Sequence, residues 1–187
     1  MRNRGLWFVL AIALALRVVL LAAGWSHPDR LMTPDSLHYI ALAEGLLDGR
    51  FGQPGRPEVF RTPGYPAFLA AVFGLGGGAR SAAAVQVLLD VGLVGLTYLL
   101  GRRLADERTG AIAAGVQAVS PVALAASVRI LSDGLFAAML AAALLLTARA
   151  MDGRRARSAL AAGGLMAAAC LVRPIGLVAA AVMVGVL

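Results

Sequence analysis

Long apolar runs separated by short polar connections organise this chain of 187 residues. The runs cover residues 6–23, 81–101, 110–128, 131–148, 158–172 and 175–187. A helix needs roughly 20 apolar residues to cross a bilayer, and lipid requires every backbone polar group to be paired inside the protein. No run shows the alternation that marks a membrane-spanning strand. The pattern predicts an all-α polytopic membrane protein in which residues 1–187 form a single transmembrane domain.

A further apolar segment, residues 65–75, is too short to span the membrane unaided, and it decides the topology. If it does not cross, Arg2, Arg4 and two later arginine groups share one side, as the positive-inside rule requires. Those groups are Arg102, Arg103 and Arg108 after the second run, and Arg149, Arg154, Arg155 and Arg157 after the fourth. The sequence therefore predicts a cytoplasmic N-terminus and an extracytoplasmic loop over residues 25–80, with 65–75 as a short helix that lies at the outer membrane surface or dips into it.

Within that loop, the stretch LMTPDSLHYIALAEGLLDG predicts a helix with recognisable ends. Thr33 suits the N-cap, Pro34 the first helical position, and Gly49 the C-terminal stop. At 100° per residue, Asp35 and Tyr39 lie on one face of this helix. The following stretch is rich in glycine and proline and is expected to form a loop with extended pieces.

Composition agrees with a membrane location and argues against a nucleic-acid partner. Hydrophobic residues make up 60% of the chain and charged residues only 14%, against roughly 25% in soluble domains. The net charge is +7, but the arginines sit singly or in short groups between apolar runs, so we expect no nucleic-acid partner. The last apolar run is short for a crossing, and we therefore expect the chain to be the N-terminal part of a protein that continues past Leu187.

Four polar residues on the predicted outer side are candidates for chemistry. Asp35 and Asp133 each begin a helix there, and two converging carboxylates could position a base and a divalent cation beside a phosphorylated substrate. Arg61, which precedes two closely spaced prolines, and Arg173 have planar guanidinium groups that match phosphate oxygens. Each of these residues also has an ordinary structural explanation. An acid in the first turn of a helix interacts favourably with the helix dipole, and an arginine at the membrane surface binds lipid headgroups.

Two charges fall inside the apolar runs, Arg17 in the first and Asp90 in the second. Both lie at similar depth from the outer side, and intramembrane charges are costly unless paired or hydrated. We expect a structural ion pair between them. A proton or ion pathway is the alternative, and it would favour a transporter.

The ordered motifs PDSLHYIALAEGLLDG, FRTPGYPAFLA, SDGLF and LVRPIG give the chain its family resemblance. In this order and on one side of the membrane, they resemble the N-terminal half of membrane glycosyltransferases with the GT-C fold. The branch most similar is the dolichyl-phosphate-mannose protein mannosyltransferase and aminoarabinose transferase-like family. The resemblance implies a GT-C-like helix bundle with short interfacial helices in a long first extracytoplasmic loop.

The resemblance also implies a reaction, the transfer of a sugar from a polyprenyl-phosphate-linked donor to a glycan, lipid or protein acceptor. It implies that Asp35 is the general base or orients the acceptor, that Asp133 is a second catalytic acid, and that Arg61 holds the lipid phosphate. Tyr39, Tyr65 and Arg173 are the further substrate-binding candidates. The expected location is a bacterial inner (plasma) membrane, with surrounding lipid as a further partner.

One departure from the family pattern bears on cofactors. Some relatives carry two adjacent acids at the first catalytic position and use a divalent metal ion, whereas Ser36 follows Asp35 here. The sequence contains no recognisable metal-ligand set, so metal dependence stays open. A transporter or flippase-like protein for a lipid-linked substrate is the alternative function, and a structural membrane subunit is the third.

Overall fold

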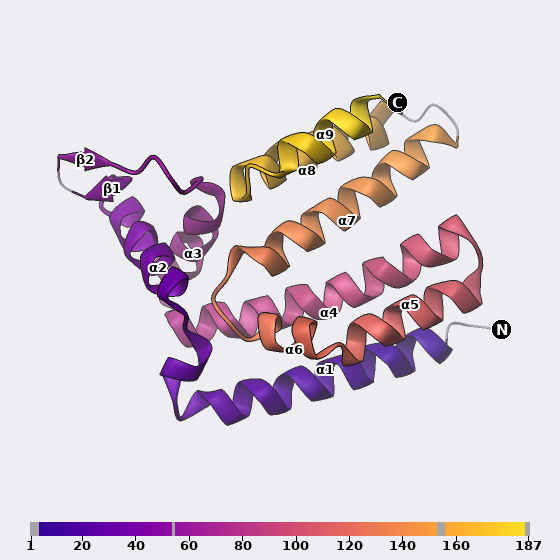
Figure 1. The fold of residues 1–187 in the computed structure, drawn as a ribbon, viewed down its shortest axis with the longest axis horizontal. Helices are drawn as coiled ribbons and strands as arrows, with labels where there is room; N and C mark the ends of the chain where they lie inside the picture. The colour runs from indigo at the N-terminus through magenta and orange to yellow at the C-terminus, as the bar shows by residue number, and fades with distance from the viewer. Residues whose placement is uncertain (1–3, 54, 153–155, 186–187) are drawn as a thin grey trace.

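Helices run side by side through most of this protein, and a smaller group of elements lies across one end of them (Figure 1). The computed structural model describes residues 4–53, 55–152 and 156–185. Of the arginines used to predict topology, Arg2, Arg154 and Arg155 lie outside the described residues. The described part is mainly helical and has almost no sheet, so the expected all-α polytopic class is confirmed.

Three helices are long and apolar enough to cross a bilayer by length and composition. They are α1 (Arg4–Trp25), α4 (Ala79–Leu104) and α7 (Ser132–Met151). Only 11% of the apolar window of α1 is buried inside the protein, which leaves most of its surface for lipid. Helix α4 packs against α1 and α7, and thereby joins the two sides of the bundle.

A bent pair follows α4, formed by α5 (Glu107–Val119) and α6 (Pro121–Ser127). The pair counts as a fourth candidate span if taken together, but its two helices are bent by 62°. The sequence predicts one uninterrupted run over 110–128, and the bend corrects that expectation. Its cause is Pro121, which lacks an N–H and disfavours helical backbone at the residue before it. Ser120 accordingly has φ −58° and ψ 122°.

The predicted ion pair inside the membrane is confirmed at this bend. Arg17 is fully buried, and its Nε lies 2.5 Å from Oδ2 of Asp90. Its Nη1 donates to the carbonyl oxygens of Ala13 and Ala118, each at 3.0 Å, and its Nη2 donates to that of Gln117 at 3.5 Å. The last two carbonyls end α5, where the proline leaves them without helical partners. Arg17 therefore neutralises Asp90 and also supplies hydrogen-bond donors to the unpaired carbonyl oxygens at the end of α5.

The chain then turns back through α8 (Ala156–Val172) and α9 (Gly176–Val184), where the sequence predicts spans over 158–172 and 175–187. Helix α8 has 17 residues and α9 has nine. Residues 186 and 187 lie outside the described part. Arg173 lies at the break between these two helices, next to Pro174.

The loop between α1 and α4 folds into several short elements. They are η1 (Pro28–Leu31), α2 (Pro34–Leu47), β1 (Gly52–Gln53), β2 (Arg56–Pro57) and α3 (Gly64–Gly74). The two strands pair antiparallel, with Gly52 opposite Pro57. Together these elements cover what we call the loop end of the bundle (Figure 1).

The predicted limits of the loop helix α2 are confirmed. Thr33 is the N-cap: its hydroxyl accepts from the Ser36 N–H at 3.2 Å, and the Ser36 hydroxyl accepts from the Thr33 N–H at 2.9 Å. Gly49 has φ 74°, the left-handed conformation that ends helices. The buried side chains of α2 pack with α3 and with the starts of α4 and α7 in one apolar cluster that includes Tyr39, Tyr65 and Ile130. This cluster fixes the loop on the bundle.

Candidate active site

The candidate residues gather at the loop end because the helices alternate in direction. Helix α7 begins there, α8 ends there, and α2 and α3 lie across it. Asp133 is in the first turn of α7, and Arg173 follows the last turn of α8. Asp35 is in the first turn of α2, and Arg61 precedes α3.

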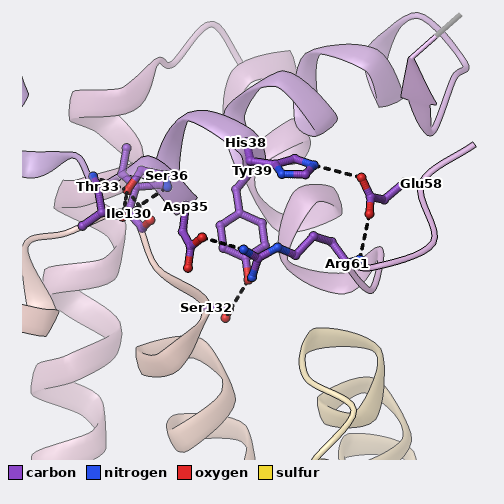
Figure 2. A network of polar contacts seen from close by, with 9 residues as sticks. All are labelled: Thr33, Asp35, Ser36, His38, Tyr39, Glu58, Arg61, Ile130 and Ser132. Carbon is purple, nitrogen blue, oxygen red and sulfur yellow. Dashed lines mark hydrogen bonds and ion pairs between the residues drawn. The ribbon is translucent and has the colours of Figure 1, made fainter. Parts of the chain in front are cut away.

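Arg61 makes direct contact with Asp35 and Tyr39 (Figure 2). Its Nη2 donates to Oδ1 of Asp35 at 2.5 Å, and its Nη1 donates to the Tyr39 hydroxyl at 3.2 Å. The guanidinium carbon also lies 5.0 Å from the centre of the Tyr39 ring, within cation–π range. The Asp35 side chain is 53% exposed and that of Arg61 31%, so a ligand can reach both. Partial burial lowers the pKa of Arg61, but Tyr39 and Asp35 outweigh it and raise that pKa.

Glu58 holds the backbone that carries Arg61. One carboxylate oxygen, Oε1, accepts from the N–H groups of Phe60 at 2.7 Å and Arg61 at 3.0 Å. The other, Oε2, lies 2.9 Å from Nε2 of His38, which projects from α2 one residue before Tyr39. Burial alone would raise the pKa of Glu58, but the hydrogen bonds from Phe60, His38 and Arg61 outweigh it and lower that pKa. Figure 2 shows the resulting chain of contacts from α2 through Glu58 to Arg61.

Sequence reasoning missed Glu58 and gave His38 no role. The signal available was an acid three residues before Arg61 in a loop rich in glycine and proline. A carboxylate placed so can accept backbone N–H groups of the turn that follows it. Its partner His38 lies 20 residues earlier in the chain and only the folded structure brings the two together.

Two hydrogen bonds fasten α2 to the start of α7. The Ser36 hydroxyl donates to the Ile130 carbonyl oxygen at 2.8 Å, and the Tyr39 hydroxyl lies 3.3 Å from the Ser132 hydroxyl. Ser132 directly precedes Asp133. These hydrogen bonds lie directly beside Asp35 and Asp133. They therefore fix the two helices that carry the predicted acids relative to each other.

Asp133 and Arg173 form a second acid–arginine pair at the same end of the bundle. Their side chains are 55% and 38% exposed. The Thr62 hydroxyl donates to the Val172 carbonyl oxygen at 2.9 Å and ties the residue after Arg61 to the residue before Arg173. The structure thus places two partly exposed guanidinium groups, each facing a carboxylate, on segments that are joined by a hydrogen bond.

Tyr65, predicted to bind substrate, lies beneath the exposed residues. It is fully buried, and its hydroxyl donates to Oε1 of Gln86 at 2.7 Å. Gln86 in turn donates to the carbonyl oxygens of Arg129 and Leu131 at 2.9 and 3.1 Å. Burial, then the nearby Tyr39 and Asp133, raise the pKa of Tyr65 and keep its hydroxyl protonated. Because its ring meets Tyr39 edge-on at 4.8 Å, Tyr65 supports the ring on which Arg61 rests.

The donor set does not fit a divalent metal ion. Among the described residues, no three side chains of His, Cys, Asp or Glu gather closely enough to hold one. Without a bound donor, each exposed carboxylate of the site faces a guanidinium group, which competes for the oxygens a cation would need. The Ser36 hydroxyl, at the position of the second acid in some relatives, is committed to Thr33 and Ile130. No metal-dependent step follows from this site.

Comparisons with known proteins identify one family. The family model for dolichyl-phosphate-mannose-protein mannosyltransferases matches residues 60–187, which is more than half of the chain. The matched range contains Arg61, Tyr65, Asp133 and Arg173, whereas Asp35 and Tyr39 precede it. Searches of curated proteins and of solved structures each gave no match.

Proposed function

The chain belongs to the dolichyl-phosphate-mannose-protein mannosyltransferase family, a family of membrane glycosyltransferases, and we propose that it transfers a sugar from a polyprenyl-phosphate-linked donor to an acceptor. The observation that carries the proposal is the Asp35–Arg61–Tyr39 contact at the loop end of a membrane bundle. A basic group for phosphate and a carboxylate for an acceptor hydroxyl stand side by side there. These are the two groups that glycosyl transfer from a phosphate leaving group requires.

Arg61 and Arg173 are the proposed ligands of the donor phosphate. Guanidinium groups bind phosphate through paired, charge-assisted hydrogen bonds. Both guanidinium groups are partly exposed and form ion pairs with exposed carboxylates. A phosphate can therefore replace those carboxylates without any movement of a buried side chain to the surface. Asp35 and Asp133 hold the two arginines in place until the donor arrives.

Donor binding also prepares Asp35 for its proposed role. Once the phosphate takes the Arg61 guanidinium, the Asp35 carboxylate is free to accept a proton from the acceptor hydroxyl. The acceptor oxygen then forms a bond to the anomeric carbon of the sugar, and the bond from that carbon to the phosphate oxygen breaks. The electron pair of that bond leaves with polyprenyl phosphate, whose negative charge the arginines stabilise. Asp133 is the proposed second acid of this site.

We place this reaction at the extracytoplasmic face of a bacterial inner membrane, with the N-terminus in the cytoplasm. The arginine distribution supports this orientation, because Arg102, Arg103 and Arg149 lie at the helix ends remote from the loop. The donor's polyprenyl chain would then remain in the bilayer while its phosphate meets Arg61 at the surface.

The test compares Asp35→Asn with wild type in the full-length protein, purified in lipid and supplied with polyprenyl-phosphate sugars and membrane acceptors. We expect release of polyprenyl phosphate to fall by about 100-fold or more, because general-base catalysis contributes roughly 10²–10⁴-fold. Binding of the lipid donor should persist. Asp48→Asn is the matched control, since Asp48 ends the same helix and also pairs with an exposed arginine, Arg50, at 2.7 Å. Equal release by wild type and Asp35→Asn would remove Asp35 from the chemistry.

A further inference from the structure

A second cluster of arginines surrounds a pocket at the end of the bundle opposite the candidate active site. The pocket has a volume of about 420 Å³ and is lined by Arg102 and Arg103 of α4, Arg149 of α7, and the leucines Leu99 and Leu145. Helices α4 and α7 pack directly against each other, so residues almost 50 positions apart in the chain meet here. The proposed glycosyl transfer makes no use of this pocket.

The charges around the pocket are unbalanced. Arg103 is committed to the protein, because its Nη2 donates to the Ala148 carbonyl oxygen at 2.9 Å and pairs with Asp152. Within the described part of the chain, the side chains of Arg102 and Arg149 make no hydrogen bond or ion pair. Like charges at one pocket repel each other, and an anion bound between them would relieve that repulsion.

The depth of the pocket indicates which anion is available. Arg102 lies about 24 Å along α4 from Gln86, which is at the loop end, taking about 1.5 Å of rise per residue. Arg149 lies about 26 Å along α7 from Ser132 by the same measure. These spans approach the roughly 30 Å hydrocarbon thickness of a bilayer, so the pocket falls at the opposite membrane surface. The phosphates of phospholipids occupy that level.

We propose that this pocket is a binding site for the phosphate headgroup of an anionic phospholipid. Arg102 and Arg149 contact the phosphate from two helices, while Arg103 holds α4 and α7 together beside it. Basic pockets between membrane helices are suited to such headgroups, and each basic residue near the surface contributes about 1 kcal/mol of attraction. The site is independent of the reaction at the loop end.

The experiment measures lipid retention by the full-length protein in vesicles of phosphatidylcholine containing phosphatidylglycerol, followed by extraction and native mass spectrometry. We expect wild type to retain phosphatidylglycerol over phosphatidylcholine. The double variant Arg102→Gln/Arg149→Gln should bind it about 30-fold more weakly, which corresponds to about 2 kcal/mol. Neither substitution removes a side-chain hydrogen bond or ion pair within the described residues, so folding should be preserved, as far-UV circular dichroism will show.

The matched control is Arg108→Gln/Arg157→Gln. It removes the same net charge from exposed residues that begin α5 and α8 at the same end of the bundle, and neither residue lines the pocket. An equal loss of lipid in both double variants would show general surface attraction and overturn the proposal. Inorganic phosphate is the remaining probe: if it displaces the lipid at millimolar concentration, the site binds free phosphate and the lipid assignment is wrong.

Discussion

Removing either member of the buried pair Arg17–Asp90 should destabilise the protein, and the two losses should not add. In Asp90→Asn, the guanidinium of Arg17 stays charged because arginine cannot be deprotonated in proteins. It is fully buried, and the one ion pair that it makes among the described residues, at 2.5 Å, is gone. Breaking a buried pair in this way costs about 3–5 kcal/mol.

Replacing the other partner, in Arg17→Met, should reduce the free energy of unfolding by less. The carboxyl of Asp90 can be neutralised by taking up a proton, a response not open to arginine. What remains is the loss of donors to the carbonyl oxygens of Gln117 and Ala118 at the end of α5. Unsatisfied buried acceptors cost about 1–3 kcal/mol. The double variant carries no buried charge, so it should lose only this last amount.

The assay is equilibrium unfolding of the full-length protein in mixed micelles, titrated with sodium dodecyl sulfate and followed by far-UV circular dichroism. All four members of the double-mutant cycle are measured together, with Thr97→Ser as a control for a polar substitution in α4. We expect the double variant to be more stable than Asp90→Asn alone, with a coupling free energy of at least about 2 kcal/mol. Losses that add to within about 0.5 kcal/mol would show that the two side chains do not interact and would refute this reasoning.

Two further predictions concern the segment that carries Arg61. Glu58→Gln should weaken donor binding about tenfold at pH 7, because the charged acceptor of two backbone N–H groups is lost. Since the pKa of Glu58 is lowered, its contribution to binding in wild type should be complete above pH 4.5 and disappear as the pH falls further. A binding titration of the variant should show no such step. Gly64→Ala should disturb the same segment, because a Cβ there would lie 2.6 Å from the backbone of Leu171. We expect a loss of about 1–3 kcal/mol on unfolding, and Gly134→Ala, with open space around its position, should be harmless; equal behaviour of the two variants would contradict the close contact.

Local and depth-dependent features of this protein could be predicted from its sequence. The ends of α2 follow from Thr33 and Gly49, because capping depends on neighbouring residues only. The Arg17–Asp90 pair follows from counting residues inward from the same membrane surface, since lipid leaves a buried charge few other partners. The sequence likewise placed Asp35 and Asp133 on one side of the membrane, and the structure brings their helices into contact there.

What the sequence did not predict depends on contacts between distant segments. That Arg61 faces Asp35, and that Glu58 joins His38, result from how the loop folds back on α2. The bend after α5 is a different case, because Pro121 is present in the sequence and a proline is known to break helices. The prediction for this run used hydropathy only and did not take the proline into account. Residues 110–128 are mostly apolar, but they form two helices and not one.

The attachment of the Arg61 segment to α8 has a consequence for how the protein is made. The Thr62 hydroxyl bonds to the Val172 carbonyl oxygen, 110 positions later in the chain, and Gly64 packs against the same turn. At about 5–20 residues per second, the ribosome needs roughly 5–20 s to add the residues in between. During that interval the segment has been synthesised but its anchor has not. The candidate site therefore reaches its final form late in synthesis, only after α8 has been made.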